Sequence, residues 1–242
     1  MVAEFDFVSR GQVRGVVAPA SWLRVDHTDA RRGPAEVWEA WPECAAILDG
    51  PMWSNRRLDG TSGAAPLFRL LDTAGRVDVP SQRAGEGVTL SVVEGVASAR
   101  RTDAVAPGAS VAVQGWPPLI VEGEVVATDV GSNAERVGRA AWALMGDGRV
   151  GLFAARASAM RAFAVELRAL GAVAAGYTDG GSSTYLRGRA APFDPVTAPA
   201  PRVFAWLVLT PPGLRAPGSR GSGVWPVVAG VGALWLWLRG GR

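Results

Sequence analysis

Short apolar runs separated by glycine, proline and polar residues dominate this chain. Runs of four to eight apolar residues bounded by turn residues are typical of buried or half-buried β-strands. The segments with this pattern are residues 12–17, 22–25, 67–71, 88–93, 110–113, 119–121, 140–145, 150–154, 172–178 and 203–209. The pattern therefore predicts a strand-rich protein.

One segment has a clear helical period, residues 159–170. Ser158 precedes it as a candidate N-cap, and Gly171 follows it as a helix stop. Its apolar face carries Phe163, Leu167 and Leu170. We expect an amphipathic helix here.

A second helix is expected over residues 35–48, interrupted at Pro42, with Cys44 in its apolar part. Strands before and after sparse helices, without regular strand–helix alternation, indicate an α+β fold. We expect a single strand-rich domain with few helices over residues 1–210, followed by a C-terminal hydrophobic tail.

Composition supports a globular domain, because 48% of the 242 residues are apolar. All 25 basic residues are arginine, the net charge is only +3, and acidic residues alternate with the arginines along most of the chain. A nucleic-acid-binding protein would concentrate its positive charge on one patch or stripe. We therefore expect no nucleic-acid partner.

The chain has one cysteine, Cys44, and one histidine, His27. A single cysteine excludes an intrachain disulfide and a cysteine zinc cluster, and a single histidine makes a transition-metal site unfavourable. We predict no metal site and no cofactor, so acid–base chemistry must rest on carboxylates. Asp26 and His27 could form an orienting pair, although a solvated turn at a strand end is the commoner role for such a histidine.

The two ends of the chain differ in character. Residues 1–14 contain Glu4, Asp6 and Arg10 within their only apolar cluster, so no N-terminal signal peptide is expected. Residues 223–238 (GVWPVVAGVGALWLWL) are uncharged and flanked by arginine. A helix of that length rises about 24 Å, which is shorter than the hydrocarbon core of about 30 Å.

Tryptophan and arginine at the ends of residues 223–238 favour the headgroup region, so a membrane anchor is the preferred interpretation. A terminal segment that docks on a partner protein is the alternative. Residues 211–222 are rich in proline, glycine and arginine and read as a linker. These features predict a membrane-associated protein of a cell envelope or a virion.

The densest polar motif is the loop Asp179-Gly180-Gly181-Ser182-Ser183-Thr184, which follows the apolar run 172–177. Glycines let the backbone approach a ligand, and hydroxyl and N–H groups can bind a sugar or a phosphate. The same composition also makes an ordinary strand-to-strand turn. The loop alone leaves both interpretations open.

The helix, the strand and this loop together resemble the hallmark of the phosphodiester glycosidase family. Further similar motifs follow the order of the family from about Trp22 to Leu209. They are ILDGPMW (47–53), GWPPL (115–119) with EG (122–123), RAAWA (139–143) with DGR (147–149), and RVFA (202–205).

The resemblance implies hydrolysis of a sugar phosphodiester to a free sugar and a phosphomonoester. It places Asp179 beside the anomeric bond, Arg139 on the phosphate and Asp49 as a second carboxylate. The implied substrate-binding residues are Gly50, Gly180, Gly181, Ser182, Ser183 and Thr184. In glycosidases, carboxyls about 5–5.5 Å apart indicate retention and a gap of about 6.5–9.5 Å indicates inversion.

This chain departs from the family pattern at several positions. Asp49 stands where the family usually has Asn, Pro51 and Ser182 stand for Gly, and Ala140 stands for Thr. Exchanging Asn for Asp replaces a neutral donor with an anion, which changes pKa values and anion recognition.

Two functions are therefore expected as alternatives. The first is a hydrolase that acts on a sugar phosphodiester, for example in a cell-envelope glycan, and is tethered by the C-terminal tail. The second is a catalytically inactive glycan-binding or structural module of the same fold, such as a phage virion protein.

Overall fold

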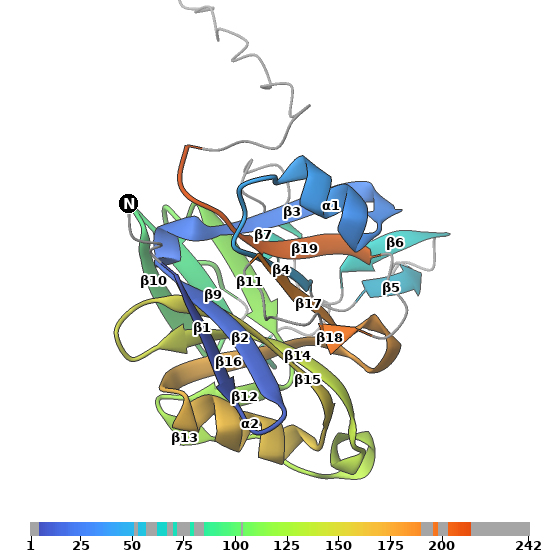
Figure 1. The fold of residues 1–242 in the computed structure, drawn as a ribbon, viewed down its shortest axis with the longest axis vertical. Helices are drawn as coiled ribbons and strands as arrows, with labels where there is room; N and C mark the ends of the chain where they lie inside the picture. Colours follow the sequence, from blue (N-terminus) through green and yellow to red (C-terminus); the bar gives the residue numbers. More distant parts are fainter. Residues whose placement is uncertain are drawn as a thin grey trace, which may run out of the picture.

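Antiparallel β-sheets make up most of the structure, a computed structural model (Figure 1). It describes residues 5–50, 53–56, 62–66, 70–71, 78–79, 85–102, 104–189, 196–197 and 203–213. The largest sheet has the order β1-β2-β15-β14-β16-β12-β13. Its strands are β1 (Asp6–Arg10), β2 (Val13–Ala18), β12 (Pro118–Val121), β13 (Glu124–Val125), β14 (Val137–Met145), β15 (Val150–Ser158) and β16 (Ala172–Gly180).

Two five-stranded sheets and a two-stranded ribbon complete the described strands. One sheet has the order β18-β17-β4-β19-β3, formed by β3 (Leu23–Arg32), β4 (Ala46–Asp49), β17 (Tyr185–Gly188), β18 (Val196–Thr197) and β19 (Val203–Leu209). The other has the order β10-β9-β11-β7-β8, formed by β7 (Leu70–Leu71), β8 (Asp78–Val79), β9 (Val88–Val93), β10 (Val96–Arg100) and β11 (Val111–Gly115). The ribbon pairs β5 (Trp53–Arg56) with β6 (Ser62–Pro66).

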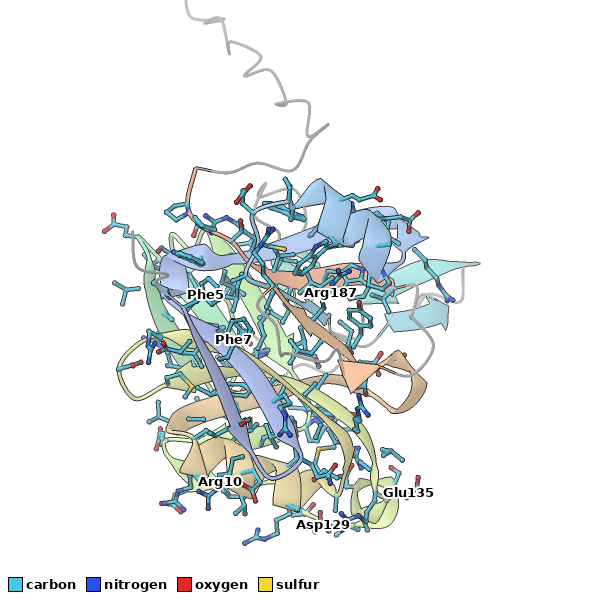
Figure 2. The ribbon with its side chains drawn as sticks, viewed as in Figure 1. Phe5, Phe7, Arg10, Asp129, Glu135 and Arg187 are labelled. Atoms are coloured by element: carbon cyan, nitrogen blue, oxygen red, sulfur yellow. The ribbon has the colours of Figure 1, made fainter. Side chains whose placement is uncertain are left out.

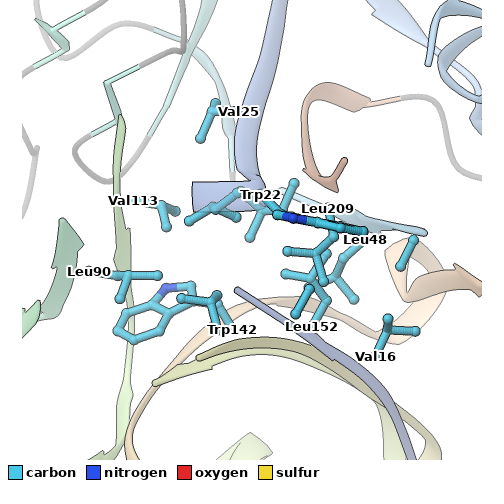
Figure 3. Packing of buried hydrophobic residues seen from close by; sticks show 14 of the residues in the cluster. Val16, Trp22, Val25, Leu48, Leu90, Val113, Trp142, Leu152 and Leu209 are labelled. Atoms are coloured by element: carbon cyan, nitrogen blue, oxygen red, sulfur yellow. The ribbon is translucent and has the colours of Figure 1, made fainter. Parts of the chain in front are cut away.

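The main core lies where the three larger sheets face one another (Figure 3). Trp142 of β14, Leu48 of β4 and Leu90 of β9 meet there, and each is 0% exposed. Side chains alternate between the two faces of a strand, so Ala141 and Ala143, the neighbours of Trp142, point to the opposite side. The large sheet is therefore buried on both faces.

The α-helices of the described residues, α1 and α2, cover outer faces, and Figure 1 shows them at opposite ends of the molecule. α2 (Met160–Ala169) packs Phe163 and Leu167 on the large sheet. α1 (Pro34–Ala40) packs Val37 over β4 and β19. The expectation of a strand-rich domain with few helices is confirmed for the described residues.

The start of α2 differs from the sequence prediction. Its N-cap is Ala159 and not Ser158, whose hydroxyl donates to the Ala159 carbonyl. Asp129, on a distant loop, instead accepts a hydrogen bond from the Arg161 amide at 2.7 Å. A tertiary contact thus replaces the local cap, whereas Gly171 ends the helix as predicted, with φ of +100°.

The helix expected over residues 35–48 is wrong in its second half. α1 ends at Ala40, just before Pro42, and residues 46–49 form the strand β4. All four residues of β4 are buried, because one face of the strand packs in the main core and the other packs against α1. Cys44 is buried as predicted, but in the connection between the helix and the strand.

His27 lies inside β3, opposite Ala205 of β19, and is not in a turn. The carboxylate of Asp26 accepts a hydrogen bond from Trp41 Nε1 at 2.7 Å and forms an ion pair with Arg32. Asp26 therefore orients the end of α1.

The predicted linker beyond residue 213 and the tail at residues 223–242 lie outside the described residues, so the domain limits stay predictions. Within the described part of the chain, none of the helices has the length and apolar character needed to cross a membrane.

Candidate active site

Asp49 is the last residue of β4 and is completely buried. Its Oδ1 accepts a hydrogen bond from the backbone amide of Tyr185, at 2.9 Å. In the described structure, Oδ2 has no hydrogen-bond partner. Burial raises the pKa of Asp49 well above its ordinary value, and the nearby Asp179 raises it further, while the Tyr185 amide lowers it. Asp49 therefore favours the protonated form.

Asp179 lies near the end of β16 and is only half-buried. Its Oδ1 accepts a hydrogen bond from the Gly180 amide at 2.7 Å. Burial raises the pKa of Asp179 to about 6, although the Gly180 amide and the Ser183 hydroxyl oppose this shift. Asp49 and Asp179 come from different sheets. The hydrogen bond from the Tyr185 amide joins Asp49 to the segment that directly follows the Asp179 loop, so the end of β4 lies beside that loop.

The loop after Asp179 is a short 3-10 turn, Gly181–Ser183, between β16 and β17. Gly181 has φ of +63°, a conformation that favours glycine, and a β-carbon there would meet nothing within 4 Å. Gly180 is extended, but a β-carbon there would lie 1.7 Å from the hydroxyl of Tyr177. Gly180 is thus required by close packing and Gly181 by its backbone conformation.

The three hydroxyl residues of the loop have different positions. The side chain of Ser182 lies outside the described part of the structure. Ser183 contacts Asp179, whereas Thr184 is 3% exposed. A β-carbon on Gly138 would lie 2.5 Å from Thr184 Oγ1, so this hydroxyl faces β14. Contacts of these residues with a substrate stay predictions.

Gly50 has a structural reason for being glycine. Its amide donates to the Ala205 carbonyl at 3.0 Å, and a β-carbon would lie 2.5 Å from the same oxygen. Asp49-Gly50 is therefore the tightly packed end of a ladder with β19. This packing holds the Asp49 backbone in place.

Arg139 of β14 lies opposite Gly180 of β16, so it belongs to the same region. Its guanidinium is buried, with only 4% of the residue exposed. Nε donates to the Ser158 carbonyl at 3.0 Å, and Nη2 contacts three carbonyls of the segment around the 3-10 turn Gly131–Ala134. The phosphate contact expected of Arg139 stays a prediction.

Sequence reasoning missed Tyr177 and Gly138. Tyr177 is 7% exposed, and burial raises its pKa to about 12, with Asp179 and Asp49 contributing in the same direction and Arg139 opposing them. A tyrosine in an apolar strand resembles an ordinary core residue. The available signal was its spacing, because Tyr177 and Asp179 are two residues apart on one strand.

The site includes no recognisable metal centre: no group of three or more His, Cys, Asp or Glu side chains gathers within the described ranges. The two carboxyls with raised pKa values are its chemically distinctive feature. Paired carboxyls of this kind can carry out general acid, general base or nucleophilic steps on a glycosidic bond.

Comparisons with known proteins identify the family and the fold of this chain. A family model described as phosphodiester glycosidase matches residues 69–205, which include Arg139 and the whole Asp179 to Thr184 loop but not Asp49. No curated protein sequence matches the chain significantly.

Solved structures share the fold at low sequence identity. The catalytic domain of zebrafish N-acetylglucosamine-1-phosphodiester α-N-acetylglucosaminidase, auto-inhibited by its pro-peptide, has a TM-score of 0.59 and 13% identity, covering 86% of this chain and 81% of that chain. A Burkholderia pseudomallei protein has a TM-score of 0.61 and 13% identity, covering 82% and 74%. Because the family model spans more than half of the 242 residues, this chain belongs to the phosphodiester glycosidase family.

Proposed function

We propose that this protein hydrolyses the glycosidic bond of a sugar-1-phosphodiester and releases the sugar and a phosphomonoester. Family membership supports the reaction type. The observation that carries the proposal is that Asp49, on one sheet, is hydrogen-bonded to the segment directly after the Asp179 loop, which leaves the other sheet. Burial raises the pKa values of both carboxyls. Such pairs divide acid and base roles in glycosidases.

The surroundings of the two carboxyls assign different protonation states. Asp179 has a pKa of about 6, so it is largely ionised at neutral pH, and it is the more exposed of the two. Asp179 is therefore the base or nucleophile that acts at the anomeric centre. Asp49 is fully buried and keeps its proton to higher pH. It acts as the second carboxyl, which holds a proton beside the ionised Asp179.

The sugar is proposed from the similar zebrafish structure, whose name specifies an N-acetylglucosamine-1-phosphodiester. A cell-envelope glycan as the natural substrate, and anchoring through residues 223–238, are part of the same proposal and rest on the sequence pattern. The phosphomonoester is a good leaving group, so the reaction depends mainly on placing a carboxylate and water at the sugar.

The test uses the methyl phosphodiester of N-acetylglucosamine 1-phosphate. Purified full-length protein should release N-acetylglucosamine and methyl phosphate in equal amounts, measured by proton and phosphorus NMR. Asp179→Asn should abolish release. The first product anomer seen by NMR distinguishes retention from inversion and therefore the two carboxyl separations.

The inactive-module alternative predicts a different result. If wild-type protein at high concentration turns over neither this diester nor the corresponding glucose, galactose and mannose diesters, the hydrolase proposal is wrong. Binding of the same diesters without turnover, measured by calorimetry, would then support a glycan-binding module.

A further inference from the structure

Arg139 donates most of its hydrogen bonds to backbone carbonyls of the protein itself. A guanidinium has five N–H donors. Nε donates to the Ser158 carbonyl at 3.0 Å, and Nη2 lies 3.2, 3.3 and 2.9 Å from the carbonyl oxygens of Ser132, Asn133 and Glu135. Glu135 is labelled on the surface in Figure 2, at the same end of the molecule as α2. Arg139 therefore joins β14 to the end of β15 and to this surface segment.

The remaining side of the guanidinium faces Tyr177. Nη1 lies 3.5 Å from the Tyr177 hydroxyl, and the guanidinium carbon lies 5.7 Å from the centre of the ring. Both residues are buried, at 4% and 7% exposure. A cation near a ring face within about 6 Å is attractive, and more so when both groups are shielded from water. Arg139 and the Tyr177 phenol are therefore in direct contact.

The phenol in turn packs against the loop that bears Asp179. Its hydroxyl occupies the space where a β-carbon of Gly180 would stand, at 1.7 Å from the ideal position. The Gly138 carbonyl closes the same space at 2.7 Å. Gly180 also donates its amide to the Asp179 carboxylate at 2.7 Å. Any shift of the phenol would therefore change the support of the Gly180 backbone and, through it, the Asp179 side chain.

We propose that Arg139 and Tyr177 form a positioning pair, in which Arg139 fixes Tyr177 and Tyr177 fixes the Gly180 backbone that orients Asp179. Arg139 then does not bind the phosphate of the substrate. Its effect on turnover rests on the proposed function, whereas its effect on the loop does not.

The first test measures the loop without substrate. Hydrogen exchange of the Gly180 amide, followed by NMR, reports the Gly180–Asp179 bond. We expect exchange to become at least about tenfold faster in Arg139→Lys and in Tyr177→Phe, and the double variant to be no faster than the faster single variant. Tyr177→Phe keeps the ring, so it remains informative if Arg139→Lys folds poorly.

The matched control is Arg156→Lys, an exposed arginine on the adjacent strand β15. It should leave the Gly180 exchange rate unchanged. The positioning pair would be overturned if the Gly180 amide exchanged at the wild-type rate in both single variants. It would also be overturned if the two effects were fully additive in the double variant.

The second test separates positioning from phosphate binding. Arg139→Lys and Tyr177→Phe are compared on the methyl phosphodiester and on the neutral 4-nitrophenyl α-glycoside of the same sugar. Positioning predicts that kcat falls by a similar factor on both substrates while KM changes less than about twofold. A KM increase of tenfold or more confined to the diester would show that Arg139 holds the phosphate.

The two proposals fail in different ways. If neither substrate is turned over by wild-type protein, the proposed hydrolysis is wrong, but the exchange result still decides whether the pair orients the loop. If turnover occurs and the exchange rates do not respond, the hydrolysis stands and the positioning pair is wrong.

Discussion

The carboxylate of Asp49 accepts a hydrogen bond from the backbone amide of Tyr185, at 2.9 Å, although these residues are 136 positions apart in the chain. This bond joins the end of β4 to the start of β17, directly after the Gly181–Ser183 turn. One amide cannot offset the burial of a whole carboxylate, which explains why the pKa of Asp49 stays raised.

We predict that Asp49→Asn stabilises the protein at pH 8, by about 1 kcal/mol or more, because it removes a charge that burial disfavours. When the pKa of a carboxyl is higher in the folded state than in the unfolded state, the protein becomes less stable as the pH rises above the unfolded-state pKa. The gain should therefore disappear at about pH 3, below the unfolded-state pKa of about 3.9, where both states are protonated. Urea unfolding at the two pH values measures it.

The exposed Asp147 provides a control of opposite sign. Hydrogen bonds from Arg149 lower the pKa of Asp147, so Asp147→Asn should be neutral or slightly destabilising at pH 8. An Asp49→Asn variant that is less stable than wild type at pH 8 would contradict the raised pKa that burial gives the Asp49 carboxyl.

Asp179→Asn is expected to lower activity and to raise the stability of the folded protein. Loss of a base or nucleophile should lower kcat by about 10²-fold or more. Because the folded pKa is about 6, the wild-type carboxylate costs stability increasingly between about pH 4 and pH 6, with an upper limit of about 3 kcal/mol. The variant should therefore have the higher melting temperature at pH 7, by calorimetry. A lower melting temperature together with full activity would refute both roles.

The pH dependence of turnover should follow the ionisation of Asp179. As pH rises through about 6, the carboxylate forms, so kcat/KM should increase with a slope of one proton. Ionisation of Asp49 at higher pH, which the raised pKa delays, should produce the descending limb. A rate series from pH 4 to 9 on the methyl phosphodiester measures both limbs. Activity that falls through pH 6 would reverse the assigned roles.

Two adjacent glycines should differ in their tolerance of alanine. Gly180→Ala places a methyl group 1.7 Å from the Tyr177 hydroxyl and 2.7 Å from the Gly138 carbonyl, so it should lower the free energy of unfolding by about 2 kcal/mol or more. Gly181→Ala meets no atom within 4 Å and carries only the strain of its positive φ, about 1 kcal/mol. Urea titrations of both variants give the order directly, and the reverse order would contradict the packing described for Gly180.

The sequence was most informative where an apolar run ended at clear turn residues. β9 and β19 have the predicted bounds for this reason. The helix prediction was wrong at residues 46–49, because a buried central strand has no polar alternation and therefore resembles the apolar side of a helix. The prediction of Ser158 as the N-cap was wrong, because the Asp129 side chain accepts the hydrogen bond from the first turn of α2. A contact between distant segments leaves no local signal in the sequence.

The candidate site shows the same division. Asp179 could be singled out from the polar, glycine-rich loop after an apolar run, whereas Asp49 was proposed through the resemblance to the family. Tyr177 could not, because its importance lies in where its hydroxyl meets Gly180 and Arg139. The destination of the Arg139 donors was equally hidden, since backbone carbonyls are present at every residue and only the fold selects four of them.

Placing the two carboxyls on separate sheets has a consequence for the order of events during folding. β14 and β15 form a local hairpin, whereas β4 pairs with β17 and β19 across a large sequence separation, so the two carboxyls come together only after these long-range strand pairs have formed. Closing such long loops is slow relative to forming local hairpins. Enzymatic activity recovered during refolding should therefore appear after the circular dichroism of the strands, making turnover a reporter of completed tertiary assembly.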